Sequence, residues 1–230
     1  NRVFSELGRL RKLKSVNPEL KIGVGGCVAQ QKGESILLRE ANVDFVFGTD
    51  NLFELPEMLN KVSQGQKISQ TERHPRQKVR NFIPDYTFQQ ARHFGIKAHL
   101  TITKGCNNHC SFCVVPITRG PEVSREPEDI LAEAQQLISV GTKEICLLGQ
   151  NVNSYKANGV DFVELLHRLD KLENLERLRF ISPHPKDFHA VLADAFVTLP
   201  SLCEHLHLPL QSGSDRILRG MRRRYTMETF

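Results

Sequence analysis

The sequence lacks the long apolar runs that cross membranes. Its 230 residues contain no stretch approaching the ~18 apolar residues that a transmembrane helix needs. No secretory signal is present, but the first residue is Asn1 and not Met, so we expect the native N-terminus to be missing. With 40% hydrophobic and 25% charged residues, the composition is typical of an ordinary soluble protein of one or two domains.

Several catalytic patterns are also missing. We find no Ser–His–Asp arrangement and no paired carboxylates. The stretch "GVGGCVAQ" fails the G-x-G-x-x-G pattern of dinucleotide-binding loops, because Val28 stands at the third glycine position. The sequence therefore gives no sign of a hydrolase triad or of a dinucleotide-binding loop.

Cysteines are few, and half of them gather in one place. The six cysteines are Cys27, Cys106, Cys110, Cys113, Cys146 and Cys203. Disulfide frameworks belong to small secreted chains. Three of the six crowd the stretch "GCNNHCSFCVVP", with the spacing C-x3-C-x2-C, and this favours metal ligation in a reducing compartment.

The cysteine stretch has no obvious fourth ligand. A zinc finger would add a paired C-x2-C element or a later H-x3-5-H. His109 directly precedes Cys110 and would be strained to reach the same metal. Cys146 and Cys203 lie in or near apolar strand patterns and are interpreted as small buried hydrophobic residues. A [4Fe–4S] cluster held by three thiolates leaves one iron open, whereas a zinc or ordinary iron–sulfur module is the alternative.

Helical and strand patterns alternate along the chain, and helices are expected, among other places, at about 30–41 and over "RILRGMRRRY". A strand, a polar loop and a helix recur four times after residue 98, with strands expected at 99–103, 144–149, 177–182 and 205–210. Loops that follow parallel strands share one edge of a sheet. The fold class is therefore α/β: a partial (βα) barrel, preceded by a fragment of a smaller α/β domain.

A basic segment separates the two parts. Residues 66–97 carry seven Lys or Arg against Glu72 and Asp85, which predicts a basic linker between domains at 1–65 and 98–230. A concentrated basic surplus is the footprint expected for a polyanion such as RNA. A solvated linker without a ligand explains the composition equally well.

The cysteine stretch resembles that of the radical S-adenosylmethionine (SAM) enzymes, because C-x3-C-x2-C is combined with an aromatic residue, Phe112, before the last cysteine. This resemblance implies that Cys106, Cys110 and Cys113 hold a [4Fe–4S] cluster whose open iron binds the amino and carboxylate groups of SAM. Electron transfer from the cluster then cleaves SAM and releases a 5′-deoxyadenosyl radical.

Longer stretches resemble the MiaB-type methylthiotransferases: "NRVFSELGRLRKLK", "GGCVAQ", "FGTDNLFELPEML", "FCVVPITRG", "LLGQNVNSY" and "HLPLQSGSDRILRGMRRRYT". The resemblance implies addition of a methylthio group to C2 of N6-isopentenyladenosine beside the tRNA anticodon. Cys27 matches the third ligand of that family's auxiliary [4Fe–4S] cluster. The first two ligands and the C-terminal RNA-binding TRAM domain have no counterpart, so we expect the chain to be truncated at both ends.

Other site residues are weaker predictions. By the resemblance, Gly149, Gln150 and Asn151 end a strand where radical SAM enzymes bind the amino group of SAM. For His207, Gln211 and Ser212, a contact with SAM or substrate competes with a polar core group and a helix cap. The pair Ser182 and His184 is a lesser candidate, because the neighbouring prolines shape that loop. The run Arg222–Arg224 either reaches tRNA phosphates or is solvated.

The resemblance also implies partners. They are a tRNA substrate and an electron donor such as flavodoxin or ferredoxin, for a monomeric cytoplasmic enzyme without a membrane. The alternatives are a related methylthiotransferase for threonylcarbamoyl-adenosine in tRNA or for a ribosomal-protein aspartate, and a non-catalytic iron–sulfur or zinc module that binds RNA.

Overall fold

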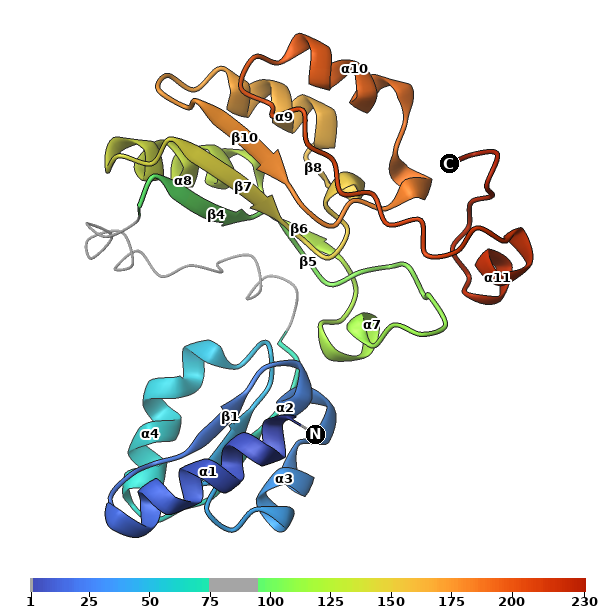
Figure 1. The fold of residues 1–230 in the computed structure, drawn as a ribbon. Helices are drawn as coiled ribbons and strands as arrows, with labels where there is room; N and C mark the ends of the chain where they lie inside the picture. The colour runs from blue at the N-terminus through green and yellow to red at the C-terminus, as the bar shows by residue number, and fades with distance from the viewer. Residues whose placement is uncertain (1, 75–94) are drawn as a thin grey trace. The chain divides into compact units, whose positions relative to one another are not determined.

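The structure is a computed structural model that describes residues 2–74 and 95–230 (Figure 1). The described residues form two compact units, one comprising 2–74 with 117–119 and the other comprising 95–116 with 120–230. Within the described ranges, no helix combines the length and the apolar character needed to span a membrane.

The first unit is built on a three-stranded parallel sheet in the order β1-β2-β3. Its elements are α1 (Arg2–Val16), β1 (Gly23–Gly25), α2 (Cys27–Lys32), α3 (Glu34–Arg39), β2 (Phe45–Phe47), the 3₁₀ turn η1 (Leu52–Glu54), α4 (Leu55–Ser63) and β3 (Ile68–Gln70).

Strand β2 shows why this sheet has helices on both faces. Successive side chains of a strand point to opposite sides, and all three residues of β2 are apolar. Val46 packs with Leu7 of α1 and Ile36 of α3 on one face. Phe45 packs on the other face with Met58 of α4. The α/β layering expected for this part of the sequence is confirmed.

Two expectations for the first unit need correction. The expected linker at 66–97 is not a linker throughout, because Ile68–Gln70 forms β3 and pairs in register with β2. Ile68 packs against the apolar cluster beneath α4, which explains why this short segment joins the sheet. The remainder of the expected linker, residues 75–94, lies outside the described residues. The helix expected at about 30–41 is divided into α2 and α3 at Gly33, whose φ is 48°.

The second unit has a parallel sheet in the order β10-β7-β4. From residue 95 onward the elements are β4 (Lys97–Thr101), β5 (Thr103–Lys104), α7 (Val115–Thr118), β6 (Val123–Ser124), α8 (Pro127–Ser139), β7 (Glu144–Leu148), η2 (Val152–Ser154), β8 (Lys156–Ala157), β9 (Val160–Asp161), α9 (Phe162–Asp170), β10 (Arg177–Phe180), η3 (Pro185–Asp187), α10 (Ala190–Thr198) and α11 (Asp215–Gly220).

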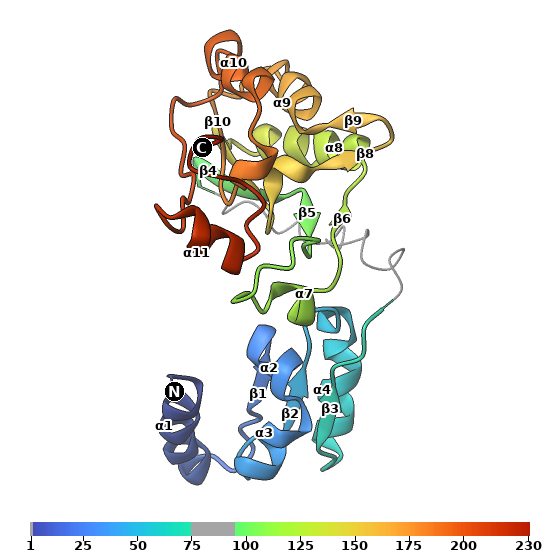
Figure 2. The same ribbon diagram turned by 90° about the vertical axis from the view of Figure 1, so that its right-hand side faces the viewer.

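Helices α8, α9 and α10 cover one face of this sheet (Figure 2). The alternation within the strands directs Leu100, Ile145 and Leu178 into one fully buried core with these helices. Pro127 suits the first turn of α8, and Asp161 caps α9 by accepting a hydrogen bond from the backbone N–H of Glu164 at 2.9 Å. The first three expected strand–loop–helix units are thus confirmed.

The fourth expected strand, at 205–210, does not form. The structure has only a single parallel bridge between Leu178 and Leu202, and residues 203–214 follow without regular strand structure. Pro209 has no N–H to contribute to a ladder. The helix expected over "RILRGMRRRY" is also shorter, because α11 ends at Gly220 and a turn with positive φ follows.

Candidate metal centre

Three loops meet at the carboxyl edge of the second sheet. The loop after β4 and β5 carries the cysteines, and the backbone N–H of Gly105 donates to Gln150 Oε1 in the loop after β7 at 2.7 Å. Asn153 Nδ2 donates to the carbonyl of His184, whose own N–H donates back to Asn153 Oδ1 at 2.8 Å. The convergence expected for the loops after the first three strands is therefore confirmed.

Gly105 permits the entry into the cysteine loop. Its φ is 78°, and a Cβ atom at this position would lie 2.2 Å from the carbonyl oxygen of Pro121 and 2.6 Å from that of Gly120. Because both obstacles are backbone atoms, no side chain can be accommodated without moving the chain. The following residue, Cys106, donates its backbone N–H to the Gly120 carbonyl at 3.1 Å.

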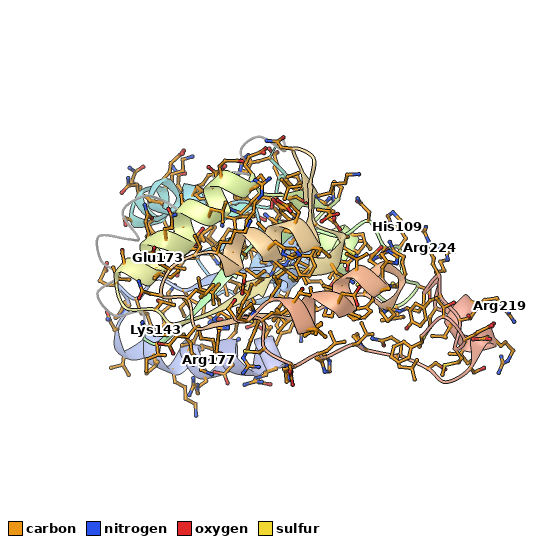
Figure 3. All side chains as sticks on the ribbon, turned by 90° about the horizontal axis from the view of Figure 1, so that it is seen from above. His109, Lys143, Glu173, Arg177, Arg219 and Arg224 are labelled. Carbon is orange, nitrogen blue, oxygen red and sulfur yellow. The ribbon has the colours of Figure 1, made fainter. Side chains whose placement is uncertain are left out.

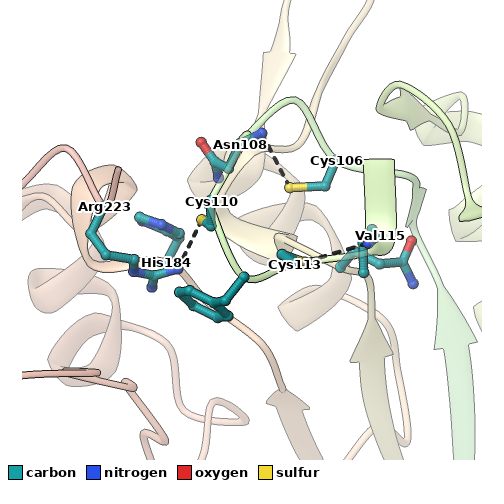
Figure 4. A pocket seen from close by; sticks show the side chains of 9 residues that line it. Cys106, Asn108, Cys110, Cys113, Val115, His184 and Arg223 are labelled. Carbon is teal, nitrogen blue, oxygen red and sulfur yellow. Dashed lines mark hydrogen bonds between the residues drawn. The ribbon is translucent and has the colours of Figure 1, made fainter. Parts of the chain in front are cut away.

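The three cysteines line one pocket of about 80 Å³ (Figure 4). Its walls are Cys106, Asn108, Cys110, Phe112, Cys113, Val115, Gln150, His184 and Arg223. His109 is not among them and its side chain is exposed. The residues come from the cysteine loop, the loops after β7 and β10, and the turn after α11.

Each cysteine sulfur accepts one hydrogen bond from an N–H group. Cys106 Sγ accepts from the backbone of Asn108 at 3.4 Å, and Cys113 Sγ accepts from the backbone of Val115 at 3.5 Å. Cys110 Sγ accepts from Arg223 Nη1 at 3.3 Å (Figure 4). Hydrogen bonds to the sulfurs are one of the features that set the potential of protein iron–sulfur clusters.

Burial raises the pKa of the Cys106 thiol, and the hydrogen bond from Asn108 counteracts this increase. Glu122 and the two neighbouring cysteines raise it further. A buried thiol of this kind loses its proton readily only when positive charge stabilises the thiolate. The site therefore needs a cation beside the sulfurs.

Arg223 supplies one positive charge inside the pocket. The residue is 6% exposed, and no carboxylate in the described part of the chain pairs with it. A buried charge without a counter-charge is costly, so its location beside Cys110 Sγ fits an anionic group in this pocket. From the sequence, Arg222–Arg224 were predicted either to reach RNA phosphates or to be solvated. In the structure, Arg223 is instead buried and lines the cysteine pocket. A run of three arginines contains no signal that the middle one is buried.

His184 presents an unused donor to the same pocket. Its Nδ1 atom accepts a hydrogen bond from the backbone N–H of Lys186 at 3.2 Å, which leaves the proton of the neutral ring on Nε2. Nε2 has no hydrogen-bond partner among the described residues. Burial, followed by the charge of Arg223, lowers the pKa of His184 to about 4, so the ring is neutral at pH 7.

The other predicted residues divide into two groups. Phe112 and Gln150 line the pocket, whereas Gly149 and Asn151 do not. A Cβ at Gly149 would lie 2.2 Å from Thr103 Oγ1, and Asn151 Nδ2 donates to Asp187 at 2.7 Å, so these two support the loops. The structure does not bring His207, Gln211 or Ser212 to the pocket wall; Ser212 Oγ instead accepts from the backbone of Ser214 at 3.2 Å.

Cys27 lies in the first unit, at the carboxyl end of β1 and the start of α2. It is partly exposed and unpaired, and the sequence has no other cysteine before Cys106. In the same helix, Gln30 joins the loops after β2 and β3, because its side chain accepts from Thr49 N and donates to the Thr71 carbonyl.

The donor set of the pocket fits a cluster bound through three thiolates. Within residues 2–74 and 95–230, no group of three or more His, Cys, Asp or Glu side chains is arranged to hold a single ion. Thiolates that each bind a different iron need not converge on one point. Three sulfurs, an uncompensated arginine and an orphaned imidazole N–H fit an anionic iron–sulfur cluster and a polar ligand beside it.

Comparison with known families identifies the class. The model of the radical SAM superfamily matches residues 100–230, more than half of the chain, so the chain belongs to this superfamily. The model of the uncharacterized protein family UPF0004 matches residues 1–48. The class predicted from the cysteine stretch is thereby confirmed.

Curated relatives of this chain show which type of radical SAM enzyme it resembles. Proteins of Francisella tularensis subsp. holarctica (strain FTNF002-00 / FTA) and subsp. novicida (strain U112) are each 45% identical over 234 residues. Both are named tRNA-2-methylthio-N(6)-dimethylallyladenosine synthase, so the resemblance to the MiaB type is confirmed. The matches cover 100% of this chain and 52% of each relative, so the chain spans about half the length of these relatives.

Solved structures support the fold. The radical SAM methyltransferase TsrM from Kitasatospora setae, with cobalamin and a [4Fe–4S] cluster bound, aligns with a TM-score of 0.67 at 17% identity, over 97% of this chain and 50% of that one. The cobalamin-dependent SAM radical enzyme OxsB, with aqua-cobalamin and SAM bound, aligns with a TM-score of 0.66 at 16% identity, over 100% and 36%. At these identities the likeness concerns the fold alone.

Proposed function

We propose that this protein is a radical SAM methylthiotransferase that adds a methylthio group to C2 of N6-isopentenyladenosine, the dimethylallyl adenosine of the relatives' name, in tRNA. The observation that carries the radical chemistry is the pocket in which three cysteine sulfurs each accept one N–H hydrogen bond. The 45% identity with the Francisella proteins supports the substrate.

The proposed cofactors are a [4Fe–4S] cluster on Cys106, Cys110 and Cys113, and SAM. Together they supply a 5′-deoxyadenosyl radical, which can take hydrogen from the unactivated C2–H bond of adenine. Arg223 balances negative charge at the Cys110 sulfur. The free Nε2–H of His184 would be a donor to SAM, and Phe112 and Gln150, which line the pocket, would limit the access of water.

Cys27 is assigned to a second [4Fe–4S] cluster that serves sulfur transfer. The assignment rests on the resemblance of "GGCVAQ" and on the match of this region to a family model distinct from the radical domain. Its place at the carboxyl edge of a parallel sheet supports the assignment, because ligands of α/β sheets bind at that edge.

The proposed partners are tRNA and a one-electron donor of the flavodoxin or ferredoxin kind, for a monomeric enzyme in the cytoplasm. The net charge of +5 supports a polyanionic substrate. All six cysteines are unpaired, which supports a reducing compartment.

Mass spectrometry of tRNA nucleosides tests the substrate. Cells that lack the gene should lose methylthiolated isopentenyladenosine and regain it with the plasmid-borne gene. Unchanged levels of this nucleoside would contradict the assignment. Loss of the methylthiolated threonylcarbamoyl nucleoside, or of methylthio-aspartate in a ribosomal protein, would instead identify that molecule as the substrate.

A further inference from the structure

A second hollow lies in the radical unit beside the cysteine pocket. It has a volume of about 530 Å³ and is lined by His109, Arg219, Arg222 and Arg224, which we call the basic hollow. All four residues are exposed, and none forms an ion pair with a carboxylate among the described residues. Three guanidinium groups without counter-charges repel one another, and an anion in the hollow would relieve that repulsion.

The positive charge is local to this end of the unit. Figure 3 shows His109, Arg219 and Arg224 at the end opposite to Lys143 and Arg177. At that opposite end the cations are neutralised, since Lys143 lies 3.5 Å from Glu176 and Arg177 lies 2.9 Å from Glu144. A general surplus of basic residues would not produce this difference.

The turn after α11 directs its arginines in two directions. Arg222 and Arg224 have φ values of 59° and 60°, in the left-handed region that costs about 1–3 kcal/mol for each residue other than glycine. Arg223 between them is buried against Cys110, and Tyr225 is buried with its hydroxyl donating to the Leu210 carbonyl at 2.5 Å. This backbone sends one guanidinium to the cysteine pocket and two into the basic hollow.

The same turn is fastened to the cysteine loop. Ser111 donates its backbone N–H to the Met221 carbonyl at 3.1 Å and its hydroxyl to the Gly220 carbonyl at 3.0 Å. His109, which lines the basic hollow, directly precedes Cys110, which lines the pocket. A ligand in the basic hollow is therefore held at a fixed position next to the pocket.

We propose that the basic hollow binds backbone phosphates of the RNA substrate, next to the nucleotide that reaches the cysteine pocket. The assignment rests on the proposed function and names the part of the chain that holds its substrate. Guanidinium groups recognise phosphate oxygens in paired, planar hydrogen bonds, and a hollow admits a strand. An acidic electron-donor protein is the competing occupant. Such a partner would contact a surface broader than this hollow, with ion-paired residues along its rim.

The test measures binding of a tRNA anticodon stem-loop to the reconstituted protein by fluorescence anisotropy at several salt concentrations. In the double variant Arg222→Gln/Arg224→Gln we expect the slope of log K against log salt to become shallower by about 1.4–1.8, which corresponds to two lost phosphate contacts. The single variant Arg219→Gln, whose backbone is helical, should lose about half as much. The matched control Lys143→Gln/Arg177→Gln removes the same charge at the opposite end and should keep the slope.

Three results would overturn the assignment. One is an unchanged slope in the Arg222/Arg224 variant, and another is an equal loss in the control. The third is a variant that still binds RNA but is no longer reduced by an acidic electron-donor protein. That result would make the basic hollow the docking site of the donor protein. The iron content of each variant reports whether the pocket is preserved. SAM cleavage by the unsubstituted protein without RNA tests the proposed radical chemistry separately.

Discussion

Each of the two units has a glycine–cysteine pair directly after a strand. Gly26 precedes Cys27 after β1, and Gly105 precedes Cys106 after β5, with φ values of 97° and 78°. A Cβ at Gly105 would strike two backbone carbonyls, whereas a Cβ at Gly26 would meet no heavy atom within 4 Å. The backbone conformation is similar, but only the second pair is enclosed by its surroundings.

This difference extends to the sulfurs. Each of the three cysteines of the cysteine loop accepts an N–H hydrogen bond, and a buried arginine adds positive charge. Cys27 stands at the start of a six-residue helix without another cysteine in its unit. A group of three cysteines that line one pocket thus contrasts with a single cysteine that has no second thiol in its unit.

The largest effect is expected from removal of a cluster ligand. Cys110→Ala should lose the cluster iron and bring reductive SAM cleavage below detection, because two thiolates cannot replace three. Cys27→Ala should abolish methylthiolation and leave SAM cleavage intact, because Cys27 does not line the cysteine pocket. Iron analysis and chromatography of 5′-deoxyadenosine measure both. Equal loss of SAM cleavage in the two variants would remove the distinction between the sites.

Alanine substitutions at Gly26 and Gly105 separate the cost of a steric clash from the cost of a positive φ. Gly105→Ala should destabilise the radical unit by about 3 kcal/mol or more, because the backbone must move away from Cβ. Gly26→Ala should cost about 1–2 kcal/mol, from its positive φ alone. Denaturant unfolding followed by circular dichroism measures both. A cost at Gly26 equal to that at Gly105 would contradict the packing difference.

His184→Asn should weaken SAM binding about tenfold or more, because a donor to a charged ligand is lost while the acceptor for Lys186 N–H is kept. Equilibrium binding of SAM to the cluster-loaded protein measures this effect. Unchanged SAM affinity in this variant would exclude His184 as a donor to the ligand.

The same variant tests the effect of pH on stability. The pKa of His184 is about 4 in the fold against 6.5 in the unfolded chain, so unfolding takes up a proton between these values. The stability associated with neutral His184 is fully present above pH 6.5 and declines by up to about 3 kcal/mol as the pH falls toward 4. His184→Asn should remove that part of the slope in unfolding experiments, and a slope equal to that of the unsubstituted protein would contradict the assigned pKa.

The smallest effect concerns the potential of the cluster. Arg223→Gln should make the midpoint potential more negative by about 60 mV for each 1.4 kcal/mol by which the guanidinium favours the reduced state. Arg223→Lys keeps the charge and should recover part of the shift. A redox titration followed by electron paramagnetic resonance measures the potential. An identical potential in all three proteins would show that Arg223 acts only in packing.

The spacing of the cysteines indicated the class of protein. The hydrophobic periodicity predicted the α/β layering and three of the four strand–loop–helix units. It did not predict β3, since Ile68 is the single apolar anchor of a short polar segment and its partner β2 is distant in sequence. The expected fourth strand does not form although "HLHLPL" has the alternation of a strand, because Pro209 offers no N–H to a ladder and this segment of the described chain meets β10 only in the bridge at Leu202.

Prediction of the site residues from the sequence has the same limit. Gln150 was predicted from the resemblance to radical SAM enzymes at the end of a strand, and in the structure it lines the pocket. Arg223 could not be separated from Arg222 and Arg224, because only the positive φ values of its neighbours turn the three side chains in opposite directions. Such features depend on tertiary hydrogen bonds, here those between Ser111 and the turn, which no local pattern reports.

The most direct test of the account is electron–nuclear double resonance on the reduced, cluster-loaded protein with SAM labelled with ¹⁵N and ¹⁷O in its amino and carboxylate groups. If three cysteines hold a cluster with one open iron, both labels should show hyperfine coupling to the cluster, and the coupling should disappear with Cys110→Ala. A fully loaded cluster without coupling to labelled SAM, or a pocket that retains zinc alone, would contradict the central claim.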